Sequence, residues 1–328
     1  MKIIVGVDIG GTKCAVSFAE CGDAQPRILE KKHFPTIPDF EGSMRQFIRT
    51  IREVLAARPD WEAKGIGVSC GGPLDSIHGL ILSPPNLPLW DHVDCVTPLR
   101  DAFGVPAALQ NDADACALAE WKWGAGRGCQ NLIFLTFGTG MGAGLILNGR
   151  LYIGAANLAG EVGHVRLAED GPEGYGKRGS FEGFCSGGGI ARLGRIEAQK
   201  ALAAGNSPLF CQSEADLNAI TAKGIAEALE AGDPLALEIY GTVGRRLGQG
   251  VAMLIDILNP ELVIIGSIYG RQRDILDPEM HAVLESEALA LSLRGCRVAA
   301  AGLGEAVGDY AALSVAADHL DSLKREEA

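Results

Sequence analysis

The sequence has no Cys-x-x-Cys pair and no long apolar run. Its nine cysteines are scattered and odd in number, which argues against a disulfide framework and indicates a reducing compartment. No segment approaches the roughly 18 uninterrupted apolar residues of a membrane-spanning helix, and the apolar run that ends at Asp8 is too short for a signal peptide. We therefore expect a cytoplasmic protein that neither spans nor crosses a membrane.

Basic residues are also scarce. Lys and Arg number 29 against 41 Asp and Glu, which gives a formal net charge of -12 at pH 7. A molecule of this charge repels polyanions, so we expect no nucleic-acid partner and no anionic membrane partner. The hydrophobic content of 47% over 328 residues supports one large or two medium cores and argues against extensive disorder.

Strand and helix patterns alternate along the first half of the chain. Residues 2–20 predict two strands around a glycine turn, and a third strand after them completes an antiparallel start. Apolar residues then recur at helical spacing over residues 40–57. A second pair of apolar runs hinged on glycines occupies residues 131–152. This alternation predicts an α/β fold of two lobes with a ligand cleft between them.

The second half of the chain reads as mostly helical. Residues 159–189 are glycine-rich, charged and too irregular for a regular element, so we interpret them as a functional loop. A long helix is predicted to begin after an N-cap at Asp233 and to end at Asn259. A buried strand, a last strand and a closing helix follow.

The two glycine turns need a physical reason. Glycine lets backbone amides approach an anion, and successive N–H groups in a turn form an anion-binding nest. In the first turn Gly10, Gly11 and Thr12 would bind phosphate, while Asp8 would hold a hydrated magnesium ion. The second turn would bind phosphate from the other side through Gly138, Thr139, Gly140 and Gly142.

Either turn alone is better explained as a hairpin turn of type I′ or II′, where glycine is expected anyway. The presence of both, the first preceded by Asp8, favours nucleotide binding. No Gly-Lys-Ser/Thr sequence opens a helix, and we find no glycine triplet that does so, which weakens the other nucleotide-binding folds.

Six segments together resemble the ROK family of repressors, open-reading-frame proteins and sugar kinases, within the actin and sugar-kinase ATPase superfamily. The resemblance runs from residue 3 to about residue 317. The segments are "VDIGGTK", "GVSCGGPLD", "PPNLPLW", "QNDADACALAEW", "LTFGTGMGAGLILNGRLYIGAANLAGEVGH" and "NPELVIIGS".

The resemblance implies two ribonuclease-H-like domains of the actin and hexokinase type. The smaller would contain residues 1–113 and a C-terminal helix at about residues 309–328, and the larger would contain residues 114–308. It also implies transfer of the γ-phosphoryl group of ATP, with Mg2+, to a hexose hydroxyl, usually the one on C6. The resemblance implies that Asp8 holds the magnesium ion through the nucleotide. The nucleotide-binding residues that it implies are Asp8, Gly10, Gly11, Thr12, Lys13, Thr136, Gly138, Thr139, Gly140 and Gly266.

Asp112 matches the family's catalytic base. An aspartate where a strand becomes a helix lies at the carboxyl edge of a sheet, where ligands of open α/β sheets bind. The residues alone also allow a helix N-cap, a role that Asp114 could fill equally well. The sugar-binding residues that the resemblance implies are Gly72, Asn111, Asp112, Glu161, His164 and Glu182. Without the resemblance, Glu161 and Glu182 would be interpreted as solvated loop charges and His164 as an ordinary loop residue.

The chain departs from the family at a structural zinc site. Most members carry a Cys-x-Cys-Gly-x-x-Gly-Cys-x-Glu motif, and its cysteines bind zinc together with the preceding histidine. Here Glu173, Tyr175 and Ser180 stand at the three cysteine positions. Because His164 and Cys185 cannot complete a four-ligand site, we expect no structural zinc and interpret Cys185 as a small buried hydrophobe. A hydrogen bond from Tyr175 or a backbone carbonyl would then orient His164.

Several alternatives stay open at this point. A repressor of the same family would carry a helix-turn-helix module for which Asp8 leaves no room, and a non-catalytic sugar sensor would use the same residues. Among kinases glucose is the default substrate, but kinases for N-acetylglucosamine, N-acetylmannosamine, mannose, fructose and allose share the residue set, and some relatives use polyphosphate.

Many relatives carry two glycines where this chain has Gly266 and Ser267, beside the adenosine pocket. The resemblance implies a homodimer, and residues 235–258 would form either its interface or a core helix.

Overall fold

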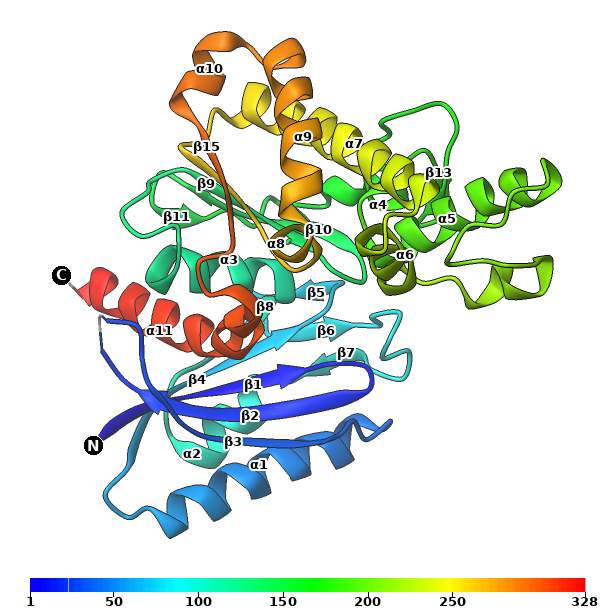
Figure 1. Ribbon diagram of the computed structural model, residues 1–328. Helices are drawn as coiled ribbons and strands as arrows, with labels where there is room; N and C mark the ends of the chain where they lie inside the picture. The colour runs from blue at the N-terminus through cyan, green and yellow to red at the C-terminus, as the bar shows by residue number, and fades with distance from the viewer. Residues whose placement is uncertain (23, 328) are drawn as a thin grey trace. The chain divides into compact units, whose positions relative to one another are not determined.

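A computed structural model describes residues 1–22 and 24–327 of the chain. The chain divides into two compact units, one of residues 1–129, 144–159 and 305–328 and the other of residues 130–143 and 160–304. Each unit is built on a five-stranded sheet with helices against it (Figure 1). The predicted α/β class and the predicted antiparallel start are confirmed.

The sheet of the first unit has the order β3-β2-β1-β4-β8. Antiparallel β1, β2 and β3 form a meander, and β1, β4 and β8 run parallel. Ile9, Cys70 and Asn111 are aligned across these parallel strands, so their carboxyl ends meet at one edge. The strands are β1 (Lys2–Ile9), β2 (Lys13–Glu20), β3 (Ile28–Pro35), β4 (Glu62–Cys70) and β8 (Ala107–Asn111), and a separate small sheet contains β5 (Leu74–Asp75), β6 (Leu80–Leu82) and β7 (Asp91–Asp94).

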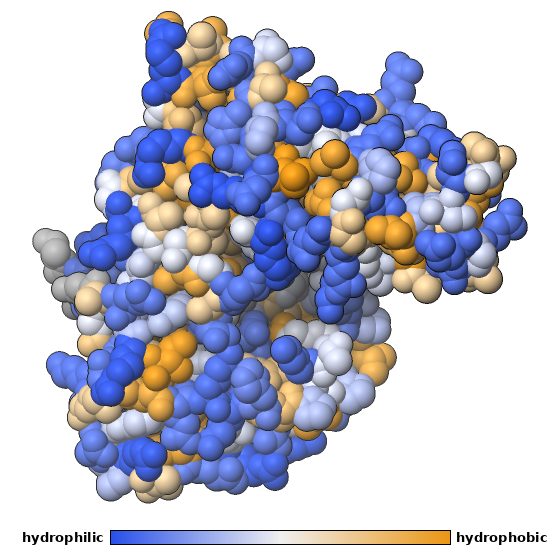
Figure 2. All heavy atoms as spheres, in the orientation of Figure 1, coloured by the Kyte–Doolittle hydropathy of each residue, from blue (hydrophilic) through white to orange (hydrophobic). Residues whose placement is uncertain are grey.

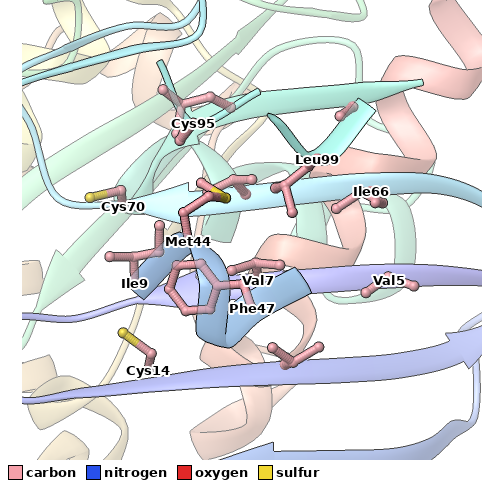
Figure 3. Packing of buried hydrophobic residues seen from close by; sticks show 14 of the residues in the cluster. Val5, Val7, Ile9, Cys14, Met44, Phe47, Ile66, Cys70, Cys95 and Leu99 are labelled. Carbon is pink, nitrogen blue, oxygen red and sulfur yellow. The ribbon is translucent and has the colours of Figure 1, made fainter. Parts of the chain in front are cut away.

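One face of this sheet packs on α1 (Phe40–Ala57), whose bounds agree with the predicted helix. Asp39 caps the helix by accepting a hydrogen bond from Gly42 N, and its apolar stripe faces the strands. Alternate strand residues such as Val7 and Ile66 meet Phe47 in a cluster of fully buried side chains (Figure 3). The short helix α2 (Thr97–Phe103) adds Leu99 to the same core.

The opposite face carries α3 (Asp112–Trp123) and α11 (Val307–Glu327). At Gly67 of β4 an added Cβ would lie 2.1 Å from Ala312 O and 2.4 Å from Ala316 N, so α11 rests directly on the strand. Ser314 Oγ of α11 donates a hydrogen bond to Ala115 O of α3 at 2.9 Å. Because of this packing α3 belongs to the first unit, whereas the sequence-based boundary after residue 113 assigned it to the second.

The second sheet has the order β11-β10-β9-β14-β15. Its strands are β9 (Leu132–Phe137), β10 (Met141–Leu147), β11 (Arg150–Leu151), β14 (Leu262–Ile265) and β15 (Arg297–Ala300). Its strands β9, β14 and β15 and residues 141–143 of β10 belong to the second unit, whereas residues 144–147 of β10 and all of β11 belong to the first. The longest helix, α7 (Pro234–Leu258), begins after the N-cap Asp233 and ends at Asn259 in the left-handed conformation, as predicted.

Further helices complete the second unit. They are α5 (Gly187–Ala203), α6 (Ala222–Glu230), α8 (Ile268–Arg271), α9 (Arg273–Glu287) and α10 (Ala290–Gly295), with a 3-10 turn at Glu214–Ala219. The 3-10 turn Gly304–Ala306 begins at the last residue of the second unit and continues into the first. No helix within the described part of the chain is long and apolar enough to cross a membrane.

The interpretation of residues 159–189 as an irregular loop was wrong in part. They form a 3-10 turn η1 (Val162–His164), a hairpin of β12 (Glu173–Gly174) and β13 (Lys177–Arg178), the helix α4 (Phe181–Phe184) and the start of α5. These elements are two to four residues long apart from α5, so hydrophobic periodicity cannot reveal them. Hydrogen bonds such as Phe181 N to Val165 O, at 2.8 Å, hold them together.

Candidate functional site

The first glycine turn joins β1 to β2 and is tied to a third strand. Thr36, just after β3, donates from Oγ1 to Gly10 O at 2.5 Å and from its amide to Thr12 O at 3.0 Å. A Cβ on Gly11 would lie 2.6 Å from the Cβ of Asn86, so the loop around Asn86 lies directly against the turn. The turn is therefore held rigidly, with Thr12 and Lys13 exposed.

The glycines do not adopt the conformation that ordinary hairpin turns require. Turns of type I′ and II′ need a positive φ in the loop, and none of Gly10, Gly11, Gly138 and Gly140 has one. Neither turn is therefore of type I′ or II′, although each joins two neighbouring strands of a sheet. Close approach explains the glycine instead, since a Cβ on Gly10 would lie 2.7 Å from Lys13 O.

Asp112 follows β8 as the first residue of α3, at the same sheet edge as Asp8. The capping role falls to Asn111, whose Oδ1 accepts a hydrogen bond from Ala113 N at 2.9 Å. Asp112 Oδ1 accepts from the same amide at 2.8 Å, and the residue is exposed. A Cβ on Gly72 would lie 3.0 Å from Asn111 Nδ2, so glycine at 72 leaves room for that amide. The fold thus brings Gly72, Asn111 and Asp112 together.

Asp8 lies in a negative environment. Its side chain is reachable by water, but the surrounding protein partly desolvates it, and the carboxylates of Asp112 and Asp309 repel its charge. These effects raise the pKa of Asp8 to about 6, against opposing contributions from Lys31 and Lys13. Lys31 is already engaged in an ion pair with Asp309. A cation beside Asp8 would therefore relieve an existing repulsion.

Replacing Asp8 by Asn should stabilise the protein in a pH-dependent way. The folded-state pKa lies above the unfolded value near 4, so the folded protein binds this proton more tightly and loses stability as pH rises from about 4 to about 6. Asn does not ionise, so the melting-temperature advantage of Asp8→Asn should grow across this window and then level off. Thermal unfolding without nucleotide or divalent cations measures it, and a difference that is constant with pH would contradict the assignment.

The second glycine turn joins β9 to β10 and is supported from several sides. Thr136 Oγ1 accepts a hydrogen bond from Gly142 N at 2.8 Å across the hairpin, and Gly138 N donates to Gly140 O at 3.2 Å. Glu182 Oε2 accepts from Met141 N at 3.1 Å. Glu182, which the resemblance places at the sugar, therefore also buttresses the backbone of this turn.

Gly266 and Ser267 follow β14 and lie beside the second turn. Gly266 N donates to Leu135 O at 3.0 Å, and a Cβ on Gly138 would lie 3.7 Å from Ser267 Oγ. Ser267 has φ 53° and ψ -110°, a region that side chains with a Cβ disfavour. Its hydroxyl accepts a hydrogen bond from Arg271 Nη2 at 3.1 Å.

Ser267→Gly should consequently raise the free energy of unfolding by about 1 kcal/mol, because relief of backbone strain exceeds the extra flexibility of the unfolded chain. Chemical denaturation measures the change. Ser267→Ala is the matched control, since it removes the hydroxyl and keeps the strain, and it should not stabilise. Equal stability of the glycine and alanine variants would show that the strain is absent.

His164 is the last residue of η1 and Glu161 is the N-cap residue before it, next to the second turn. A Cβ on Gly163 would lie 2.2 Å from Met141 O and 3.2 Å from the Cβ of Glu182, so the segment packs on the turn. His164 Nε2 is 3.8 Å from Glu161 Oε2. The second unit thus brings Glu161, His164 and Glu182 close to one another.

The residues at the positions where most relatives have zinc-binding cysteines have other roles here. Tyr175 lies with its ring centroid 4.6 Å from that of His164, so a ring contact positions the histidine, and Lys177 Nζ donates to His164 O at 2.7 Å. Ser180 caps α4 by accepting from Gly183 N at 3.0 Å. Cys185 is fully buried and desolvation raises the pKa of its thiol, which confirms its reading as a small hydrophobe. That the protein binds no structural zinc stays a prediction.

The sequence analysis missed the start of α5. A glycine triplet, Gly187–Gly189, does open a helix here, behind the N-cap Ser186. Gly187 N donates to Gly138 O at 2.7 Å, so this helix begins at the second glycine turn. The signal was available, because Ser186 followed by three glycines and a helical apolar pattern is a recognisable helix start.

Comparison with known proteins agrees with this picture. A family model described as the ROK family matches residues 4–318. A glucokinase of Thermotoga maritima is 34% identical over 275 residues, which is 83% of this chain and 84% of that protein. A DNA-binding transcriptional dual regulator of Escherichia coli is 28% identical over 303 residues, 87% of this chain and 68% of the regulator.

A solved structure shows the same fold. The ROK family glucokinase from Streptomyces griseus, in complex with glucose and AMPPNP, has a TM-score of 0.74 and 29% identity, with 96% of this chain and 99% of that chain covered. The fold and these matches define a sugar kinase built on two α/β units of the actin and hexokinase type. The chain belongs to the ROK family.

Proposed function

We propose that the protein transfers the γ-phosphoryl group of ATP to the 6-hydroxyl of a hexose, with glucose as the default substrate. The observation that carries this proposal is the placement of Asp112 and the Asp8 turn at one sheet edge, beside Asn111 and Gly72. The Thermotoga maritima relative is a glucokinase, and the Streptomyces griseus structure holds glucose and AMPPNP. Both support ATP and glucose as substrates here.

In this reaction Asp112 accepts the proton of the attacking hydroxyl. Phosphoryl transfer proceeds through a loose transition state, so positioning and charge neutralisation contribute most of the rate and the proton moves late. The carboxylate of Asp112 is exposed and can be reached by a hydroxyl, while Asn111 fixes the helix start behind it. The side chains of Asn111, Glu161, His164 and Glu182, with Gly72, bind sugar hydroxyls, since amide, carboxylate and imidazole groups pair well with them.

The phosphates are bound by the two glycine turns. Gly10, Gly11, Thr12 and Lys13 offer amides, a hydroxyl and an ammonium group. Thr136, Gly138, Thr139 and Gly140, with Gly266, contribute from the second unit.

The residues present also fit a magnesium ion. Asp8 offers the hard oxygen that magnesium prefers, and the repulsion that raises its pKa is what a cation would relieve. No group of three or more His, Cys, Asp or Glu among the described residues is arranged to hold a metal ion by itself. This agrees with an ion that arrives with the nucleotide phosphates and keeps most of its water. Such an ion would neutralise phosphate charge.

A kinetic panel tests the proposal. Purified protein with ATP and magnesium is assayed for sugar-dependent ADP release with glucose, mannose, fructose, allose, N-acetylglucosamine and N-acetylmannosamine, and kcat/KM is compared. Glucose should give the highest value, and 31P NMR should place the phosphate on C6. A higher value for another sugar would reassign the substrate, and polyphosphate in place of ATP tests the donor.

A non-catalytic sugar sensor is the second candidate, and the family's regulators motivate it. Absence of sugar-stimulated ADP release, together with calorimetric binding of a hexose, would favour it. The net charge of -12 argues against a DNA-binding role, and no retardation of DNA at low salt is expected.

We also propose that the protein forms a homodimer through the second unit. One face of α7 is buried as a core helix, but Leu237, Met253 and Ile257 are exposed by 52%, 42% and 76%. Leu289 and Leu291, at 60% and 71%, lie on or beside α10, which packs on α7. Apolar side chains gather on the surface over α9 and α10 in Figure 2. Sedimentation equilibrium distinguishes the dimer from a monomer.

A further inference from the structure

Arg192 on α5 has a partly exposed side chain that carries a positive charge. Its Nε is buried and has no hydrogen-bond partner, and no ion pair of its guanidinium occurs within residues 1–22 and 24–327. Burial of an unpaired guanidinium donor is unfavourable, so a structural role alone does not account for this residue. A bound anion would satisfy both the charge and the donor.

The guanidinium lies over the first turn of its own helix. Side chains on an α-helix lean toward the N-terminus, and an added Cβ on Gly188, four residues earlier, would lie 3.4 Å from Arg192 Nη2 and 3.6 Å from Nη1. A helix N-terminus has partial positive charge, which repels a cation and attracts an anion. The fold therefore places two positive features together.

One backbone donor at the same place is also free. Gly187 N donates to Gly138 O at 2.7 Å, Gly189 N to Ser186 Oγ at 2.9 Å, and Ile190 N to Ser186 O at 2.8 Å. Among the described residues, none accepts a hydrogen bond from Gly188 N. The open amide and the guanidinium therefore meet at Gly188.

The glycine triplet supports this reading position by position. A Cβ on Gly189 would lie 2.2 Å from Gly183 O, and one on Gly187 would lie 3.2 Å from Gly138 O, so packing explains glycine at both. At Gly188 the three atoms nearest to an added Cβ all belong to the guanidinium of Arg192, at 3.4–3.7 Å. Packing does not require glycine at 188, whereas access of a ligand to its amide does benefit from it.

We propose that Gly188 N and the Arg192 guanidinium together bind a phosphate group of the phosphoryl donor, next to the Gly138 turn. The proposal rests on the proposed function and adds a binding residue to it. A planar guanidinium and an amide match the oxygens of a phosphate, and the guanidinium remains charged at all relevant pH values. Arg192 would stabilise the negative charge of the donor before and during transfer.

Arg192→Gln tests the proposal through binding, independently of turnover. Calorimetry with AMPPNP and magnesium should show a Kd about tenfold to a hundredfold higher than that of the wild type, as expected for loss of a charge-assisted bond. Inorganic tripolyphosphate should lose affinity similarly, and adenosine should bind as before. Arg192→Lys should recover part of the loss. Lys200→Gln is the matched control, because it removes one positive charge from the other end of α5, where Lys200 pairs with Glu197. This variant should bind AMPPNP as the wild type does.

Gly188→Asp separates binding from stability. An aspartate in the first turn favours the helix dipole and offers Arg192 a partner four residues away, so the melting temperature should rise. The same carboxylate would occupy the anion position, so affinity for AMPPNP and tripolyphosphate should fall at least as far as in Arg192→Gln. Higher stability with lower affinity is not expected of a merely structural residue.

Unchanged AMPPNP affinity in Arg192→Gln and Gly188→Asp would overturn the inference while leaving the kinase intact. Equal loss of adenosine binding would also overturn it, since that result indicates general damage to the site. Failure of the wild type to release ADP with any sugar would instead overturn the proposed function, and tripolyphosphate binding would still decide whether this site takes phosphate.

Discussion

Asp112→Asn should lower kcat by about 10²–10⁴-fold while the Kd for the sugar changes little. The amide has nearly the same shape as the carboxylate and can still accept a hydrogen bond from Ala113 N, so the start of α3 should be preserved. It cannot accept the proton of the attacking hydroxyl. The loss should therefore appear in the chemical step and not in binding.

Single-turnover kinetics and sugar calorimetry measure the two effects separately. Asp101→Asn is a suitable control, since Asp101 is an exposed carboxylate on α2 in the same unit and the charge change is the same. Retention of about a tenth of the wild-type activity by Asp112→Asn would show that another group is the base.

Gly67→Ala should destabilise the first unit by about 3 kcal/mol or more. The new methyl carbon would lie 2.1 Å from Ala312 O and 2.4 Å from Ala316 N, both of which are backbone atoms of α11. Backbone atoms in a helix cannot rotate away as a side chain can, so the whole helix would have to move off β4. Contacts of α11 with β1 and α3 would loosen with it, including the hydrogen bond from Ser314 to Ala115.

Thermal unfolding and hydrogen exchange of the α11 amides test this prediction. Gly22→Ala is the matched control, since an added Cβ there meets nothing within 4 Å and φ is not positive. A melting temperature for Gly67→Ala equal to that of the wild type would mean that α11 does not rest on β4 in solution.

Much of the fold follows from local sequence. The helical spacing of apolar residues over 40–57 gave α1 with its observed bounds, and Asp233 with Pro234 marked the start of α7. These features depend on neighbouring residues only, because helix periodicity and capping are properties of a few consecutive positions. The glycine turns could be located in the same way, but not their conformation.

The support of the site required the tertiary structure. Thr36 holds Gly10 from 26 positions away, and Glu182 accepts from Met141 N across 41. Such partners are brought together by packing of whole elements, and nothing in the adjacent sequence marks them. The same holds for the ring contact between Tyr175 and His164, whereas the sequence suggested only a hydrogen bond that involves Tyr175 or a backbone carbonyl.

The sequence by itself determined the alternation of strands and helices and the family, and it supplied the residues that we propose bind ATP and a sugar. Only the tertiary structure decided that Asn111 and not Asp112 caps α3, that α3 packs with α11, and that Arg192 reaches an open amide at Gly188. The physical reason is the distance along the chain over which each kind of interaction acts. Periodicity and turn chemistry act over a few bonds, whereas burial, charge pairing and close backbone contact depend on which distant segments the folded chain brings together.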